Sequence, residues 1–527
     1  MKILVSDPIS EKGVELLKSN PAFQVDKKIG LKEDELCAII GEYDGLIVRS
    51  QTKVTRKVIE AAKRLKVVGR AGVGVDNVDV EAATERGIIV MNTPGGNTIS
   101  TAEHTFSMML AMARKIPQAH ASMKAGKWDR KSFEGTELFG KTLGVIGLGR
   151  IGSEVAKRAM AFGMKVLAYD PFLSPSRAKT LQVEMVALDR LYKESDFITV
   201  HVPVTEQTKG MINRDSIAKM KKGVRIINCA RGDIVVQNDL YEALKSGKVA
   251  AAALDVYEKE PPVNLPFLEL DNVVLTPHLG ASTHEAQESC GTEIAEQIAE
   301  ALSGGTIRNA VNMPSIDAKV LAALQPYMAF AEKLGRLVAQ LAPRRIERFT
   351  VEFYGKAGEL ETSPITRAAL KTFLENAEGG DVNYVNAPSI AHRLGIHVEE
   401  LKSTEPIDYA ELITVRAQAN GVNVCASGTF YGSLNNPRIV RINGMPVEVA
   451  PSGVLLILHN QDRPGVVGWI GTILGKHGIN IANMSLGRDR EGGTALTVLN
   501  LDTAPSLEVI AEVKKDKDIL DVKIAKL

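Results

Sequence analysis

The sequence predicts an α/β protein built on two doubly wound parallel sheets, and three observations carry this prediction. Residues 1–98 alternate short apolar runs with amphipathic stretches, which is the rhythm of successive βαβ units. The same rhythm restarts at residue 141. At the restart, a G-x-G-x-x-G pattern lies between an apolar run and a stretch of helical character.

The order of apolar and amphipathic runs defines the expected elements. In the first unit, strands are expected at 2–7, 45–49, 66–70 and 87–92, and helices at 11–19 and 56–65. A long helical segment, 100–115, leads into the second unit. The second unit should contain six strands, at 144–149, 165–170, 197–203, 224–230, 251–257 and 273–278. A helix over 283–302 is expected to cross back onto the first unit, which would make that unit discontinuous in sequence.

The character of the chain changes beyond residue 314. Residues 315–450 keep βαβ-like patterning without a nucleotide signature, and Asn443–Gly444 predicts a two-residue hairpin turn. The last segment is compact, with an apolar strand, a turn, an amphipathic helix and a second strand in order. The expected domains are therefore 1–98 with 283–314, then 99–282, 315–450 and 453–527.

Composition excludes several classes of function. A net charge of +1 gives no electrostatic reason to expect nucleic acid or an anionic membrane as a partner. The four cysteines contain no C-x-x-C pair, so neither a metal site nor a disulfide framework is expected. The sequence also shows no signal peptide and no uncharged apolar run of about 18 residues. We therefore expect a soluble, cytoplasmic protein.

The glycine pattern predicts a dinucleotide site. Gly147 permits a tight turn, Gly149 lets the backbone approach a pyrophosphate, and Gly152 lets the helix pack close to the strand. Asp170 follows eighteen residues after the last glycine, at the end of a strand. A carboxylate there can accept hydrogen bonds from the adenine ribose hydroxyls and repels a 2′-phosphate. The predicted cofactor is therefore NAD rather than NADP.

Three polar residues directly follow strands of the nucleotide unit. Arg231 can hold a carboxylate through two parallel hydrogen bonds, and His278 can accept a proton as hydride leaves a 2-hydroxy acid. Glu260 can bond the other ring nitrogen of the histidine. Each residue alone is more often a surface or turn residue. Their common position at strand exits favours a catalytic set.

An anion site is predicted in the first unit. Consecutive N–H groups of Gly72, Val73 and Gly74 can bind a carboxylate, and Arg49 and Ser50 point to the same region. Additional cations are needed for a phosphate on the far end of the substrate. The candidate cations are Arg49, Arg70 and Arg130, with Lys131 behind them. Solvated surface charge is an equally good interpretation of each one alone.

Together, the motifs N-C-A-R-G-D (228–233), D-V-Y-x-x-E-P (255–261) and T-P-H-L-G-A (276–281) resemble those of the D-isomer-specific 2-hydroxyacid dehydrogenases. The resemblance covers essentially the whole chain. Within this family it is similar to the long form that acts on D-3-phosphoglycerate. The fold it implies is a Rossmann-type doubly wound nucleotide-binding domain inserted in a flavodoxin-like substrate domain. An α/β intervening domain and a C-terminal ACT domain, of ferredoxin-like α+β fold, follow.

The resemblance also implies residue roles and partners. The implied catalytic residues are Arg231, Glu260 and His278, and the implied NAD contacts, besides Gly147, Gly149, Gly152 and Asp170, are Arg150, Ile151, Cys229, Ala230, Arg231, Asp255, His278, Leu279, Gly280 and Ala281. Oxidation of D-3-phosphoglycerate to 3-phosphohydroxypyruvate is the implied reaction, the first step of phosphorylated L-serine biosynthesis. L-serine is the implied inhibitor, bound through His459, Asn460, Asp462 and Asn480 near the turns of the ACT unit. ACT units bind ligands between two copies, so a homo-oligomer, dimer or tetramer, is expected.

Other functions remain open from the residues alone. The chain could be a dehydrogenase of another D-2-hydroxy acid, such as glycerate or glyoxylate. It could also be an NAD-sensing, corepressor-like interaction protein on the same scaffold, or a serine sensor with a vestigial dehydrogenase half. The complete catalytic set favours an enzyme over the last two.

Overall fold

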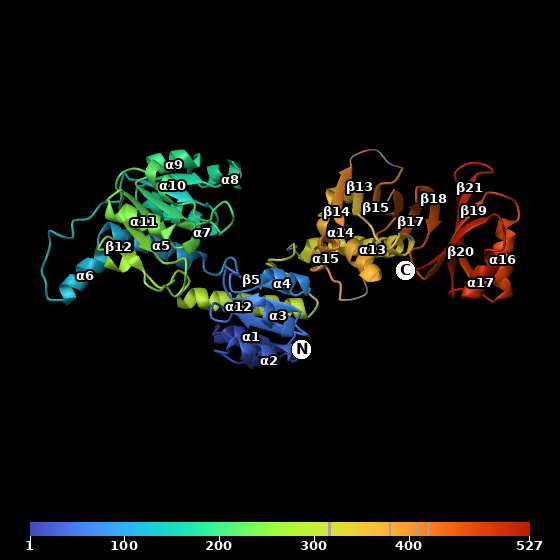
Figure 1. Cartoon of the computed structure of the whole chain (residues 1–527), viewed down its shortest axis with the longest axis horizontal. Coiled ribbons are helices and arrows are strands. Elements are labelled where there is room, and N and C mark those ends of the chain that lie inside the picture. The colour runs from blue at the N-terminus through green and yellow to red at the C-terminus, as the bar shows by residue number, and fades with distance from the viewer. Residues whose placement is uncertain (174, 315–317, 379–380, 404, 406–407, 420) are drawn as a thin grey trace.

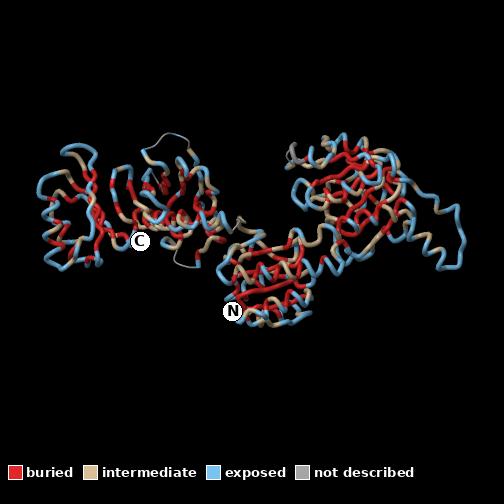
Figure 2. Tube along the Cα trace, turned by 180° about the vertical axis from the view of Figure 1, so that it is seen from behind, coloured by how far each residue is buried: buried red, intermediate tan, exposed pale blue. Residues whose placement is uncertain are grey.

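Four sheets follow one another along the chain, each with its own helices (Figure 1). The computed structural model describes residues 1–173, 175–314, 318–378, 381–403, 405, 408–419 and 421–527. Buried segments run through the centre of each unit (Figure 2). Among the described residues, no helix combines the length and the apolar character needed to cross a membrane.

The first sheet is parallel, with strand order β2-β1-β3-β4-β5, which is the flavodoxin-like order. Its strands are β1 (Lys2–Val5), β2 (Gln24–Lys27), β3 (Gly45–Val48), β4 (Val67–Arg70) and β5 (Ile89–Asn92). The helices between them are α1 (Glu11–Ser19), α2 (Glu33–Ile39), η1 (Ile40–Glu42), α3 (Arg56–Ala61) and α4 (Val80–Glu85). All four residues of β3 are buried, as expected for a strand covered on both faces.

The second sheet is also parallel, in the order β12-β11-β10-β9-β6-β7-β8. Its strands are β6 (Thr142–Ile146), β7 (Lys165–Tyr169), β8 (Glu184–Met185), β9 (Phe197–Val200), β10 (Val224–Asn228), β11 (Val249–Leu254) and β12 (Val273–Leu275). Its helices are α5 (Thr98–Ala113), α6 (Ile116–Lys124), α7 (Arg150–Ala161), α8 (Pro175–Thr180), α9 (Leu188–Glu194), α10 (Arg214–Lys219), α11 (Gln237–Lys245), η2 (Gly232–Ile234) and η3 (Pro266–Glu269). The order reverses between β6 and β9, and such a switch point is where doubly wound sheets bind ligands. The predicted Rossmann-type fold is confirmed.

Helix α12 (His284–Leu302) follows the second sheet but packs on the first. It lies so close to α1 that a Cβ on Gly13 would stand 2.4 Å from the carbonyl oxygen of Gly291. Ile294 and Ile298 contact β4 at Gly69, where a side chain would collide with both. The second unit is therefore inserted between two segments of the chain that both belong to the first unit.

The third unit combines a long helix with a mixed sheet of order β14-β13-β15-β16-β17-β18. Its elements are α13 (Ala318–Leu341), β13 (Arg348–Gly355), η4 (Lys356–Glu359), α14 (Ser363–Glu378), α15 (Ala387–Arg393), β14 (His397–Ser403), β15 (Glu411–Ala419), β16 (Val422–Phe430), β17 (Pro437–Ile442) and β18 (Met445–Val449). Only β13 and β14 pair in parallel, so the βαβ pattern extends over less of this unit than the sequence suggested. The turn predicted at Asn443–Gly444 is confirmed, with both residues at positive φ.

The fourth unit has the ferredoxin-like order β20-β21-β19-β22, with antiparallel pairs throughout. Its elements are β19 (Val454–Gln461), α16 (Val466–Lys476), β20 (Ile481–Arg488), β21 (Thr494–Leu501), α17 (Leu507–Val513) and β22 (Ile519–Lys526). Leu456 and Leu458 face the two helices. Leu455 and Ile457, which alternate with them, share one hydrophobic core with α13 of the third unit.

Candidate active site

The three glycines of the loop between β6 and α7 occupy three different environments. A Cβ on Gly147, whose φ is 91°, would lie 2.6 Å from the carbonyl oxygen of His201. A Cβ on Gly152 would lie 2.0 Å from the carbonyl oxygen of Gly147, so the helix packs tightly on the turn. Gly149 has open space where its side chain would be. This is the arrangement that lets a pyrophosphate approach the backbone.

The loop also offers charge complementarity to a dinucleotide. Helix α7 begins without a side-chain cap, which leaves its first N–H groups available to an anion. Asp170 follows β7, and its Oδ2 accepts a hydrogen bond of 2.9 Å from the N–H of Leu148. The carboxylate therefore lies against the glycine loop. Arg150 and Ile151 form the first turn of α7, beside these groups.

The predicted acid–histidine pair is present. Nδ1 of His278, after β12, lies 2.6 Å from Oε2 of Glu260, which follows β11. Glu260 also accepts a 3.1 Å hydrogen bond from the N–H of Tyr257. Burial alone would raise the pKa of Glu260, but the bonds from His278 and Tyr257 and the nearby charges hold that pKa below its ordinary value. Glu260 is therefore ionised at the near-neutral pH at which His278 has to accept a proton.

Arg231, after β10, reaches across to the first unit. Its Nε and Nη2 lie 3.0 and 2.9 Å from Oδ2 of Asp76. Its guanidinium rests on Gly74, where a Cβ would stand 1.8 Å from Nη2. Burial would raise the pKa of Asp76, but the charge and hydrogen bond of Arg231 lower it below the ordinary value. The ion pair with Asp76 was not predicted from the sequence.

A cavity of about 430 Å³ lies between the carboxyl ends of the two parallel sheets. Predicted residues from both units line it, namely Arg49, Ser50, Arg70, Gly72, Glu260 and His278. The predicted residues Val73, Gly74 and Arg231 are not among the residues that line it. Nε of Arg70 is buried and has no hydrogen-bond partner among the described residues. Burial, and then the charge of Arg231, lower the pKa of Arg70 to about 10. A buried donor without a partner next to other cations fits an anionic ligand.

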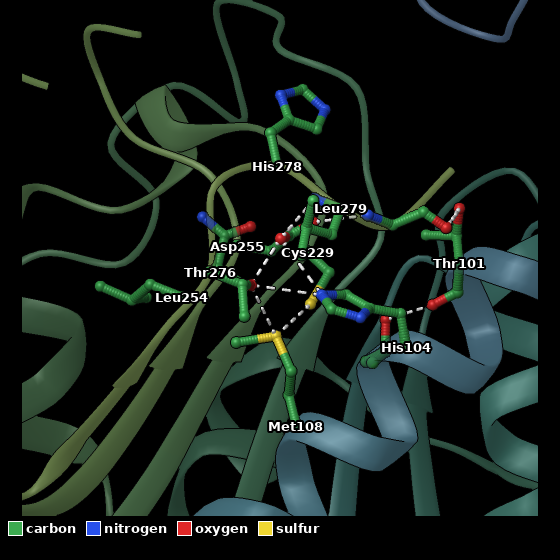
Figure 3. Close-up of polar contacts among 12 residues, drawn as sticks. Thr101, His104, Met108, Cys229, Leu254, Asp255, Thr276, His278 and Leu279 are labelled. Atoms are coloured by element: carbon green, nitrogen blue, oxygen red, sulfur yellow. Dashed lines mark hydrogen bonds and ion pairs between the residues drawn. The ribbon is translucent and has the colours of Figure 1, made fainter. Parts of the chain in front are cut away.

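The side chain of Asp255, a predicted NAD contact, is engaged within the chain. Its carboxylate is buried and accepts hydrogen bonds from Leu279 N at 2.7 Å, Gly280 N at 2.9 Å and Thr276 Oγ1 at 2.6 Å (Figure 3). His104 adds a further contact. The side chain of Asp255 therefore holds the turn at 276–280, and its contact with NAD stays a prediction.

Cys229 also points into the protein. Its Sγ lies 3.6 Å from Sδ of Met108 (Figure 3), and burial, reinforced by the charge of Asp255, raises the pKa of the thiol to about 12. Any contact of Cys229 with a cofactor would therefore come from the backbone, and its neighbour Ala230 is partly exposed. Ala281 lines the cavity, and the side chain of Leu279 is exposed.

Arg130 does not join the cavity within this chain. It is exposed in the irregular segment after α6, and a different set of residues lines the cavity. The prediction was based on charge alone, and charge does not show where a loop leads. The contact of Arg130 with the substrate stays a prediction.

The four predicted effector residues are not neighbours. His459 and Asn460 lie within β19 and not on a turn, and Asn460 is buried with its Oδ1 bound to Thr497 Oγ1 at 2.9 Å. Asp462 pairs with Arg488 at one end of the sheet. Asn480 bonds Asp502 at the other end. Since β19 and β20 run in the same direction, one ligand within one subunit cannot touch both Asp462 and Asn480.

Exchange of Glu260 for glutamine should alter the pH dependence of stability. A carboxylate with a lowered folded-state pKa stabilises the protein above the unfolded-state value of about 4.3, and the contribution is lost as pH falls through the folded-state value. We expect the Tm of Glu260→Gln to lie below that of the parent near neutral pH, with the gap closing in acid. Calorimetry from pH 3 to 7, with the exposed Glu258→Gln as control, measures this. A Tm difference between Glu260→Gln and the parent that does not change with pH would contradict this expectation.

Three family models match successive parts of the chain. They are the NAD-binding domain of D-isomer-specific 2-hydroxyacid dehydrogenases over residues 106–280, the D-3-phosphoglycerate dehydrogenase intervening domain over 323–443, and the ACT domain over 454–518. Among solved structures, D-lactate dehydrogenase from Aquifex aeolicus, complexed with NAD and lactic acid, is 32% identical with a TM-score of 0.54. It covers 60% of this chain and 100% of its own. The TT0316 protein of Thermus thermophilus is 36% identical with a TM-score of 0.55, over 59% of this chain and 100% of its own.

The fold and the site together define a D-isomer-specific 2-hydroxyacid dehydrogenase with an NAD-binding domain. Curated relatives match along the full length. D-3-phosphoglycerate dehydrogenases from Archaeoglobus fulgidus and Methanocaldococcus jannaschii are each 48% identical over 100% of both chains. The Bacillus subtilis enzyme is 43% identical over 100% of this chain and 99% of its own. The chain belongs to the D-3-phosphoglycerate dehydrogenase family.

Proposed function

We propose that this protein oxidises D-3-phosphoglycerate to 3-phosphohydroxypyruvate with NAD as the hydride acceptor. The supporting observation is the cavity between the two parallel sheets, where arginines of the first unit face the His278–Glu260 pair of the second. A small dianionic or trianionic acid suits this charge. The names of the full-length relatives point to the same substrate.

The residues divide the reaction among themselves. Arg231 and the N–H groups of residues 72–74 bind the substrate carboxylate, which displaces Asp76 from the guanidinium. Arg49 and Arg70 bind the phosphate at the far end. His278 accepts the proton of the C2 hydroxyl, and Glu260 stabilises the imidazolium that forms. NAD held by the glycine loop and Asp170 would supply the acceptor for the hydride of C2, so that the alcohol becomes a ketone.

The dinucleotide selectivity rests on Asp170. Asp170→Ser should weaken NAD and lower the ratio of kcat/KM for NAD to that for NADP by at least about tenfold, because repulsion of the 2′-phosphate disappears. Steady-state rates with both dinucleotides measure the ratio. Asp189→Ser, an exposed change on α9, serves as the control. Preference of the parent for NADP would refute the role of this carboxylate.

The decisive assay follows NADH formation from D-3-phosphoglycerate. The proposal is supported if D-3-phosphoglycerate is oxidised and neither the oxidation of D-glycerate nor the reduction of glyoxylate is faster. Faster turnover of an unphosphorylated acid would assign the chain to another D-2-hydroxy acid. Absence of turnover with all of them would favour an NAD-sensing interaction protein.

Regulation, assembly and location extend the proposal. The ACT domain suits an amino-acid effector, and we include L-serine inhibition of a homo-oligomer. A serine site built from Asp462 of one copy and Asn480 of another would reconcile their separation with a joint role.

L-serine added to the assay of the full chain should lower the rate, and light scattering gives the subunit number. Four unpaired cysteines suit the reducing cytoplasm.

A further inference from the structure

One stripe of helix α5 lies behind the turn that carries His278. Ser100, Thr101, His104 and Met108 occupy neighbouring positions on one face of this helix. The hydroxyls of Ser100 and Thr101 donate to the carbonyl oxygen of Gly280 at 2.7 and 3.2 Å. Nε2 of His104 lies 3.1 Å from Oδ1 of Asp255 and 3.2 Å from Oγ1 of Thr276 (Figure 3).

The geometry fixes which atom of His104 carries a proton. The side chain of Asp255 is 1% exposed, and it is held as an acceptor of the Leu279 and Gly280 amides. An ionised carboxylate can only accept, so Nε2 of His104 must donate. A buried carboxylate is stable only when its oxygens have donors, and His104 is the one donor to Asp255 that α5 supplies among the described contacts.

The backbone of this turn is strained at His278. His278 has a φ of 55°, a left-handed conformation that is uncommon for residues other than glycine. Its N–H donates to the carbonyl oxygen of Asp255 at 2.9 Å. The polar groups of the turn are therefore engaged from behind, while the imidazole of His278 points away from the network (Figure 3). Such strain persists only where the surroundings over-determine the backbone.

We propose that His104 is a positioning residue, which acts through Asp255 to hold the 276–280 turn in the conformation that directs His278 at the substrate. The inference rests on the proposed function for its kinetic consequence. His104 does not touch the cavity, and it lies outside the residues that line it. Its effect should therefore fall on kcat and not on substrate binding.

Two substitutions separate the donor from the bulk of the ring. His104→Gln retains an N–H at a similar reach, whereas His104→Leu fills the space without a donor. A third variant, Met109→Ala, creates a cavity in the same helix at a buried position of the hydrophobic core, and so matches a loss of stability. Tm values of all three are measured in parallel.

His104→Leu should lower kcat by about tenfold, with KM for D-3-phosphoglycerate changed by less than about twofold, because misplacement of a catalytic group acts on the reaction step. His104→Gln and Met109→Ala should keep kcat within about twofold. Equal losses in the leucine and glutamine variants, or no loss in the leucine variant beyond that of Met109→Ala, would overturn the proposal.

A second readout does not depend on turnover. Hydrogen exchange of the Leu279 and Gly280 amides, followed by mass spectrometry of peptides spanning 276–281 in the full chain, should accelerate in His104→Leu alone. Unchanged exchange there would overturn the proposal even if activity fell. If the parent fails to oxidise D-3-phosphoglycerate but the exchange pattern holds, the proposed function fails while the positioning role stands.

Discussion

Replacement of His278 by alanine is expected to lower kcat by about 10²–10⁴-fold, the usual contribution of a general base. His278 is one of the residues that line the cavity, and its Nδ1 already lies 2.6 Å from Oε2 of Glu260. Only Nε2 remains to accept the hydroxyl proton. Without it, the proton must leave to water while hydride departs, which raises the barrier of the chemical step.

The measurement is steady-state NADH formation with saturating D-3-phosphoglycerate. His392→Ala, which removes an exposed histidine of α15, should leave the rate unchanged and so controls for handling and fold. NADH affinity, measured by fluorescence titration, should survive in His278→Ala because the glycine loop and Asp170 are intact. A kcat within a few-fold of the parent would remove His278 from the mechanism.

Replacement of Arg231 by leucine is expected to lower kcat/KM by about 10²–10³-fold, the cost of removing one partner of a charge pair that substrate binding would bury. In the structure, the guanidinium lies on Gly74 and pairs with Asp76. The substrate carboxylate must take the place of Asp76 in this pair. The substitution therefore removes the group that fixes C2 relative to the dinucleotide.

Asp76→Asn provides the matched comparison. It weakens the competing ion pair but leaves the guanidinium in place, so KM for D-3-phosphoglycerate should stay the same or fall. Opposite effects of the two substitutions would establish that the carboxylates compete for one arginine. A rise in KM in Asp76→Asn comparable to that in Arg231→Leu would show instead that the pair serves only to hold the two units together.

The nucleotide half could be predicted from the sequence because its signals are local. The glycines, the apolar strands and the polar residues at strand ends each lie within one short segment, and the parallel topology brings the strand ends together. The two missed strands of the parallel sheets lacked such signals. Strand β2 has no fully buried residue, and β8 contains only two residues.

Contacts between residues far apart in the chain could not be predicted from the sequence. Asp76 and Arg231 meet although 155 residues separate them, and His104 is one histidine in a helix that is otherwise ordinary. The predicted effector residues show the converse, because closeness in sequence does not place their side chains together within one subunit. Asn460 and Asp462 are close in sequence, but one is buried inside a strand while the other lies beyond the end of that strand.

The core shared by the last two sheets has a consequence for how the C-terminal unit can be handled. Leu455, Ile457 and Ala525 lie in the same apolar cluster as residues of α13, and Gln340 of α13 exchanges two hydrogen bonds with the backbone of Lys526. Cleavage of the chain near residue 452 would expose a hydrophobic surface on both fragments and favour their aggregation. The unit is therefore not an interchangeable module. Transplanting it onto another enzyme requires taking α13 and its sheet along.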